Sequence, residues 1–432
     1  MFAVLSPSRR VEIPPNLELF SREVDREFPE VRQLVDELYS TLAHVNAAAD
    51  AVFERDAVWP PGSFWEAIET RRVANGLPFV GHDRTTDLLG KFPPGHPYRE
   101  IVHVPTSFAT DIAAAPGQLP AFPLARLHGA WTRGVLALSD GADELENFLL
   151  ERIEAHGGVC RLDRRVSRIV VRRGVVAGVV EEGEEEPIGT TSVVSEQSGE
   201  TLADLANGEG VTPRARRDWP RLTATAGRYV LSAVVGRAAL PDALPAESFF
   251  LPERGALPDP RRPVLHLQRH DLEDEAGTLP QSLLVAEAVL PTRGPLTLLE
   301  AREAVLAAML AHLPFLEEHL EALDSPHDGL PLYLYEAGIR KEIDRVHVQE
   351  TSPNPEPMQW QWSVEPAGFL ELAGEPIRGP IPGTYLVGPT VLPALGQEGE
   401  LIAAWGAARV ISRRDRARQR MRRQMWSKIE TG

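Results

Sequence analysis

The stretch that decides the fold lies near the end of the chain, at Gly383-Thr384-Tyr385-Leu386-Val387-Gly388-Pro389-Thr390-Val391-Leu392-Pro393-Ala394-Leu395-Gly396-Gln397-Glu398-Gly399-Glu400. Its apolar run 384–387 predicts a buried strand, and the apolar residues of 401–411 predict a helix. Gly388 lets the backbone approach a ligand, while Gly396 and Gly399 bracket the first turn of the helix. The sequence therefore predicts a strand, a glycine turn and a helix whose N-terminus points free N–H groups into the turn.

The chemistry of this helix N-terminus favours one kind of ligand. The aligned peptide dipoles place partial positive charge at the start of the helix. A reduced flavin carries negative charge at its pyrimidine edge, which such a helix end would stabilise. The pattern is therefore typical of a flavin site.

A second informative stretch covers residues 139–194. Ser139-Asp140-Gly141 predicts the start of a helix that runs to about His156 and ends at Gly157-Gly158. One face of this helix is apolar, with Leu145, Phe148, Leu149 and Ile153. Short strands are predicted over 159–162, 166–171, 175–180 and 188–194, and the acidic run 181–186 predicts a solvated hairpin tip.

Together these two stretches resemble the phytoene dehydrogenase-like family of FAD-dependent oxidoreductases, which includes carotenoid desaturases, isomerases and retinol saturases. The resemblance covers most of the chain in order, including 11–53, and is loose over 200–350. It implies an α/β fold with an FAD-binding Rossmann-like domain built from separated segments. It also implies a mixed-sheet and helical substrate domain with an apolar tunnel for a long lipid.

The resemblance also implies site residues. Val166 would lie where the backbone meets the adenine, Gly388 beside the ribityl chain, and Gly399, Glu400 and Leu401 at the flavin ring. Two positions depart from the family, since Pro389 stands where many relatives carry an acid and Ala394 where many carry glycine.

The larger departure is the motif that holds the FAD pyrophosphate. Family members begin with a strand, a G-x-G-x-x-G turn and a helix, and this sequence contains no such unit. The nearest pattern, Gly208-Glu209-Gly210-Val211-Thr212-Pro213, has Pro in place of the third glycine. A strand–helix–strand unit is missing, and Met1 falls about where the early hairpin of the family begins.

Two explanations of this gap stay open. A separate polypeptide could supply the N-terminal unit and share the FAD with this chain. Alternatively, the chain could have lost flavin and act as a non-catalytic scaffold that binds a lipid or a protein. In either case the chain alone should bind FAD poorly, because the pyrophosphate carries two negative charges and this chain is acidic.

Composition excludes several other classes of function. The 432 residues include 45 Lys and Arg against 62 Asp and Glu, a formal charge of −17, which argues against nucleic-acid binding. The single cysteine, Cys160, excludes an internal disulfide and cysteine-based metal sites. The sequence contains no G-x-S-x-G elbow, which argues against a serine hydrolase. No catalytic residue is assigned, because flavin chemistry needs no protein nucleophile.

Histidines give weaker signals. His266, Gln268 and His270 alternate on one predicted strand and could line a cavity, bind a metal or be hydrogen-bonded within the sheet. His312 and His319 lack a third ligand at helical spacing, so no metal site is predicted.

The end of the chain predicts a basic amphipathic helix. Residues 413–429 hold eight basic side chains and one acid, with apolar residues four apart at Ala417, Met421, Met425 and Ile429. Such a helix could bind an anionic membrane surface or an acidic partner, or pack against the body of this chain. The start of the chain has no secretory signal, and no apolar run is long enough to span a membrane, so we expect a cytoplasmic protein. Binding of 413–429 to an anionic membrane surface would make it peripheral at the membrane.

The domain organisation follows from these expectations. Residues 126–205 and 360–411 would form the incomplete FAD domain, 1–125 the cap, 206–359 the substrate domain and 412–432 the basic helix. The function expected is that of one subunit of a split FAD-dependent oxidoreductase that acts on a long apolar substrate.

Overall fold

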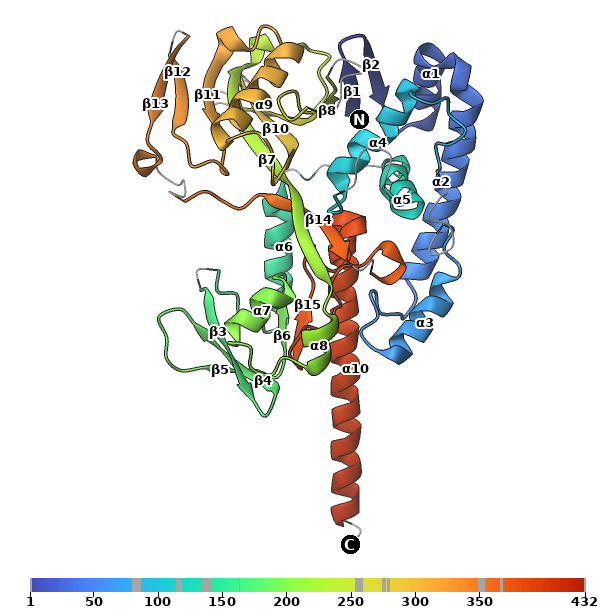
Figure 1. The fold of residues 1–432 in the computed structure, drawn as a ribbon, viewed down its shortest axis with the longest axis vertical. Helices are drawn as coiled ribbons and strands as arrows, with labels where there is room; N and C mark the ends of the chain where they lie inside the picture. The colour runs from blue at the N-terminus through green and yellow to red at the C-terminus, as the bar shows by residue number, and fades with distance from the viewer. Residues whose placement is uncertain are drawn as a thin grey trace. The chain divides into compact units, whose positions relative to one another are not determined.

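The computed structural model describes residues 2–79, 87–113, 119–133, 138, 141–162, 164–252, 259–273, 277, 280–336, 338–348, 354–365 and 368–430, with side chains to 416. The chain divides into two compact units (Figure 1). Unit 1 comprises 1–44, 84–133 and 223–363, and unit 2 comprises 45–83, 134–222 and 364–432.

A large mixed sheet forms the centre of unit 1. Its strand order is β13-β12-β11-β7-β10-β9-β8-β1-β2, and β14 also pairs with β7. Within this sheet β1 pairs with β8 in parallel, while the long β10–β7 pair is antiparallel with Gln281 opposite Gly236. The strands are β1 (Phe2–Ser6), β2 (Arg9–Ile13), β7 (Arg221–Gly236), β8 (Glu247–Phe250), β9 (Leu265–Leu272), β10 (Gln281–Pro291), β11 (Leu320–Asp324), β12 (Leu332–Glu336), β13 (Ile339–Ile343) and β14 (Gln359–Glu365).

The core of unit 1 lies between this sheet and helix α9 (Leu298–His312). Alternate residues of β7, including Tyr229 and Leu231, are fully buried because strand side chains alternate between faces. They pack with Val305 and Met309 of α9. Helix α9 begins at a capping box in which Thr297 and Glu300 bond each other's backbone N–H groups.

The remaining helices of unit 1 come from the first third of the chain. They are α1 (Leu17–Glu27), the first part of α2 (Arg32–Phe53), α4 (Pro97–Ala109) and α5 (Ala121–Ala130). Phe20 of α1, Tyr39 of α2 and Trp131, which follows α5, form edge-to-face ring contacts with centroids 5.0 to 5.4 Å apart.

Unit 2 contains two small sheets. β15 (Thr384–Leu386) pairs in parallel with β6 (Val193–Ser195), and β3 (Val166–Arg172), β4 (Val175–Glu181) and β5 (Ile188–Gly189) form an antiparallel sheet. Helices α3 (Phe64–Ala74), α6 (Ala142–Ala155), α7 (Gly199–Leu205), α8 (Pro213–Asp218) and α10 (Gly396–Glu430) complete the unit. Ala403, Ala407 and Val410 anchor α10 in its core, where Gly406 lies against Trp59 and Ile377.

The structure confirms much of the predicted secondary structure and corrects it at three places. The sequence predicts a helix over 295–321, whereas α9 ends at His312, because Leu313 precedes Pro314 and leaves the helical region. The strand predicted over 188–194 is divided into β5 and β6, since Thr190 bonds the backbone of Ser192 and forms a turn.

The third correction concerns residues 159–162, which form no strand. Val159 and Leu162 are 79% and 72% exposed, and β6 has β15 as its only neighbour among the described strands. A strand needs a partner for its backbone hydrogen bonds, and this segment has none in the described chain. The predicted cap residues Ser139 and Asp140 lie outside the described residues.

None of the helices in the described part of the chain is long and apolar enough to cross a membrane.

Candidate functional site

The predicted glycine turn follows β15 in unit 2. Gly388 is buried, and a methyl group there would lie 2.0 Å from the carbonyl oxygen of Glu196. The backbone after β15 therefore touches the backbone after β6 directly, which only glycine allows. This close approach explains Gly388 by packing within the chain, whether or not a ligand also lies there.

Gly396 and Gly399 shape the start of α10. Gly396 is the first residue of α10, directly after the short 3-10 turn Pro393–Leu395, and has φ +51. A methyl group at Gly399 would lie 2.3 Å from the carbonyl oxygen of Leu392, so the turn folds back onto the helix start. Glu400 is half-buried and Leu401 is 68% exposed.

Glu375 holds this region together and was missed from the sequence. It is 3% exposed, and its carboxylate accepts hydrogen bonds from the Gly199 backbone N–H (2.9 Å), the Trp219 indole N–H (2.8 Å) and the Thr390 hydroxyl (2.7 Å). One buried carboxylate thus joins the start of α7, the residue after α8 and the turn after β15. A single glutamate in a loop carries no sequence pattern that would have indicated this role.

Val166 lies in a different element from the other predicted site residues. It begins β3 of the antiparallel sheet, opposite Glu181, and is 37% exposed. Gly388, Gly396, Gly399, Glu400 and Leu401 belong to the turn after β15 and to α10. Their role in holding FAD stays a prediction.

Unit 2 exposes an extended set of apolar side chains, here called the α6 face. No residue of α6 is buried, although Leu145, Phe148, Leu149 and Ile153 recur at helical spacing and are 43% to 49% exposed. Val159 and Leu162 follow directly and are more exposed still. An amphipathic helix is normally stabilised by packing of its apolar face, and here that face is open.

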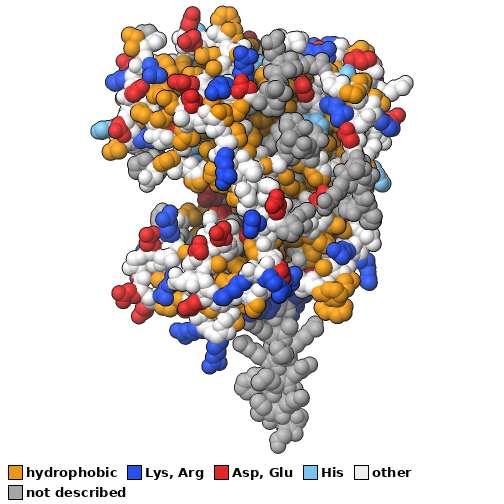
Figure 2. All heavy atoms as spheres, viewed as in Figure 1, with side chains coloured by type: hydrophobic (Ala, Val, Ile, Leu, Met, Phe, Trp, Pro, Cys, Tyr) orange, Lys and Arg blue, Asp and Glu red, His pale blue; other side chains and the backbone are white. Residues whose placement is uncertain are grey.

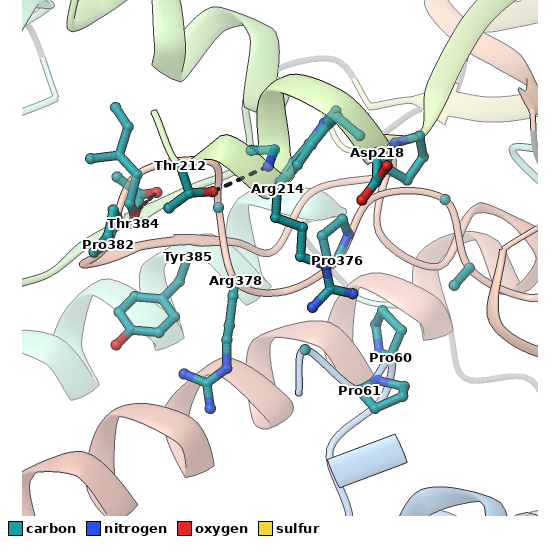
Figure 3. A pocket seen from close by; sticks show the side chains of 18 of the residues that line it. Pro60, Pro61, Thr212, Arg214, Asp218, Pro376, Arg378, Pro382, Thr384 and Tyr385 are labelled. Atoms are coloured by element: carbon teal, nitrogen blue, oxygen red, sulfur yellow. Dashed lines mark hydrogen bonds between the residues drawn. The ribbon is translucent and has the colours of Figure 1, made fainter. Parts of the chain in front are cut away.

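A cavity of about 610 Å³ also lies within unit 2. Its lining combines three arginines with prolines and aromatic side chains, from the segments 60–62, 212–220 and 368–385 and from Arg414 (Figure 3). Arg378 forms an ion pair with Glu66 at 2.5 Å, which with other hydrogen bonds outweighs the effect of burial and lowers the pKa of Glu66. None of the six predicted site residues lines this cavity, and no motif in the sequence indicated it.

In unit 1, the strand histidine His266 is hydrogen-bonded within the sheet, one of the alternatives the sequence left open. Its ring lies between Glu287 at 3.0 Å and Glu247 at 2.9 Å and stacks on Phe249. Burial lowers the pKa of His266, but the two carboxylates outweigh it and raise the pKa to about 9. Glu287 also faces Arg228, which pairs with the buried Asp111 at 3.3 Å. Burial raises the pKa of Asp111 to about 6.

Two basic side chains of the predicted amphipathic helix, Arg413 and Arg414, contact other parts of unit 2, whereas Arg416 is exposed and the side chains of 417–429 lie outside the described residues. Arg413 pairs with Asp56 at 3.1 Å and Glu69 at 3.4 Å. The hydroxyl of Tyr385 accepts a hydrogen bond from Arg414. Basic side chains gather on the lower part of the visible face in Figure 2, where α10 leaves the rest of unit 2.

Comparison with known proteins gives only distant similarities. No protein-family model matches the chain, and no curated protein matches it in sequence. A solved oxidoreductase from Methanosarcina mazei covers 73% of this chain and is itself covered to 64%, with 15% identity and a TM-score of 0.45.

Two further solved structures are less similar. A reduced UDP-galactopyranose mutase covers 72% of this chain and is covered to 61%, with 11% identity and a TM-score of 0.36. RAB GDI from Plasmodium falciparum covers 61% and is covered to 62%, with 9% identity and a TM-score of 0.33. The chain spans less than two thirds of the length of each of these three structures. Similarities of this size assign the chain to no family.

Proposed function

We propose that this chain is one subunit of an FAD-dependent oxidoreductase for a long apolar substrate, isoprenoid or lipid-like. A separate polypeptide supplies the strand–glycine turn–helix unit that holds the FAD pyrophosphate. The observation that carries this proposal is the α6 face, which leaves an entire amphipathic helix without a buried residue.

The packing of α6 supports a missing partner. A 14-residue helix is marginally stable in water when nothing covers its apolar face. Covering the exposed half of Leu145, Phe148, Leu149 and Ile153 would contribute roughly 1 kcal/mol for each side chain. The face could therefore supply roughly 4 kcal/mol to a complex, about a thousandfold in affinity.

The parallel sheet supports the same partner. A two-stranded sheet is marginal by itself, and β6 pairs only with β15 among the described strands. Val194 of β6 is 50% exposed, and the apolar segment 159–162 runs without a strand neighbour. A strand–helix unit would offer both a strand for pairing and a helix for packing.

Electrostatics explain why the strand–glycine turn–helix unit matters for FAD binding. The pyrophosphate carries two negative charges and needs backbone N–H donors at a glycine turn. The chain has a formal charge of −17 and encodes no G-x-G-x-x-G turn. We therefore expect FAD to bind only to the complex.

Co-purification tests the proposal. The tagged chain is expressed alone and together with each neighbouring reading frame, and bound flavin is measured by absorbance after size-exclusion chromatography. The chain alone should be colourless, and one complex should contain FAD. Tight FAD binding by the chain alone would overturn the split site, and a partner complex that stays colourless would favour the scaffold function.

A matched pair of variants locates the interface. Phe148→Asp on α6 should abolish both the partner and the flavin. Phe315→Asp, at an exposed phenylalanine of unit 1 (69% exposed), should retain both. Equal loss in the two variants would refute the α6 face as the docking surface.

A further inference from the structure

We infer that the cavity of unit 2 binds an organic phosphate, a phosphate monoester or diphosphate attached to an apolar chain. This inference goes beyond the proposed function, because the cavity contains none of the residues predicted to hold FAD. It rests on three observations about the cavity: the origin of its arginines, its balance of charge and its apolar wall.

The arginines come from three different elements of unit 2. Arg214 extends from α8, Arg378 from the segment before β15, and Arg414 from α10. Figure 3 shows the side chains of Arg214 and Arg378, which both line the cavity. Guanidinium groups bind phosphate oxygens through paired hydrogen bonds, so arginines converging from several elements suit a phosphate.

The acidic groups near the cavity already interact with arginine side chains. Asp218 lines the cavity, but its carboxylate accepts three hydrogen bonds from Arg217, which lies outside the lining. Glu66 is buried beneath Arg378 and does not line the cavity. Because Arg378 is paired with Glu66, Arg214 and Arg414 supply the positive charge left for a ligand, in a chain that is strongly acidic overall.

Two of the arginines, Arg214 and Arg414, have N–H donors left for a ligand. Within the described residues, the side chain of Arg214 forms no hydrogen bond. The hydrogen bonds from Arg217 and, more weakly, the charge of Arg214 lower the pKa of Asp218. The contact described for Arg414 is the hydrogen bond of 3.2 Å to the hydroxyl of Tyr385, and this places its guanidinium against β15. The several N–H groups of each guanidinium leave donors for a phosphate.

The rest of the lining is apolar. Pro60, Pro61 and Pro376 form part of the wall (Figure 3), together with Phe369 and Trp219. Trp219 donates its indole N–H to Glu375, so its ring offers the cavity an apolar surface. The volume lies within the range of small-molecule sites. Such a wall suits a hydrocarbon chain attached to the phosphate.

Calorimetric titration of the isolated chain tests the inference, with octyl phosphate, octanoate, octanol and inorganic phosphate as probes. Octyl phosphate should bind at least tenfold more tightly than each of the others, because only it combines a dianion with an apolar chain. If octanol or octanoate bound equally well, the cavity would not require a phosphate group. If inorganic phosphate bound equally well, the cavity would not require an apolar chain. Either result would overturn the inference.

Variants assign the binding to this cavity. Arg214→Gln and Arg414→Gln should each weaken octyl phosphate roughly tenfold or more. Arg216→Gln is the matched control, since Arg216 lies on the same helix outside the lining. Equal effects at Arg214 and Arg216 would refute the site. Near-UV circular dichroism confirms that each variant is folded. The titration uses neither FAD nor a partner, so its result is independent of the proposed split enzyme.

Discussion

The charge on His266 should make the stability of unit 1 depend on pH above neutrality. His266 lies between Glu247 and Glu287 and has a pKa of about 9 in the folded chain. An unfolded histidine titrates near 6.5. Because the folded pKa is the higher one, the stabilisation is fully present below about pH 6.5 and is lost as the pH rises through about 9.

The size of the effect follows from the two pKa values. A difference of about 2.5 units corresponds to about 3 kcal/mol at 1.36 kcal/mol per unit. The side chain of His266 is only 12% exposed, so water screens its interactions little. We therefore expect His266→Gln to remove most of a stabilisation of this size at about pH 6 and little of it at about pH 10.

Urea unfolding at these two pH values measures the free energy of unfolding. The difference in this free energy between wild type and His266→Gln removes the contribution of groups that titrate alike in both proteins. His270→Gln, at an exposed position of the same strand, is the control and should behave as wild type at both pH values. An NMR titration of the His266 ring should give a midpoint near 9. A midpoint at or below 7, or a difference that does not change with pH, would refute the reasoning.

Two further predictions concern unit 2. Glu375→Ala should destabilise the chain by roughly 3 kcal/mol or more, because two buried donors and one partly buried donor would lose their acceptor. Urea unfolding followed by tryptophan fluorescence measures this, and a loss below about 1 kcal/mol would contradict it. The full chain should float with anionic vesicles, and removal of residues 417–432 should abolish this flotation. The truncation removes most of the basic helix while Arg413 and Arg414 keep their contacts. Unchanged flotation would exclude the membrane role of the tail.

Local patterns predicted the elements of this fold well. The apolar residues of 401–411 indicated the first part of α10, which buries Ala403, Ala407 and Val410, and the run 175–180 indicated β4, whose alternate residues are buried. These predictions depend on the period of apolar residues, which reflects one buried face. The turn at Thr190 and the helix end at Leu313 were missed because a single side chain or a following proline decided them.

The sites were harder to predict because they join distant segments. Arg214, Arg378 and Arg414 lie far apart in the sequence and meet only in the folded unit. Gly388 was interpreted as room for a ligand, and the structure adds the contact with Glu196 that also requires glycine. Residue spacing alone could not have indicated this contact, because residues 196 and 388 are brought together by the pairing of β6 and β15.

The two kinds of strand edge in this chain have different consequences for self-association. β13 is an exposed strand at one edge of the large sheet and carries Arg340, Lys341 and Glu342, which discourage pairing with another molecule. β6 carries only Val193, Val194 and Ser195 and has no such charges. The edge of β6 is therefore the more open to pairing with another molecule. If the partner chain that we propose covers β6, this polypeptide made in excess over that partner should aggregate, and balanced synthesis of the two chains should prevent it.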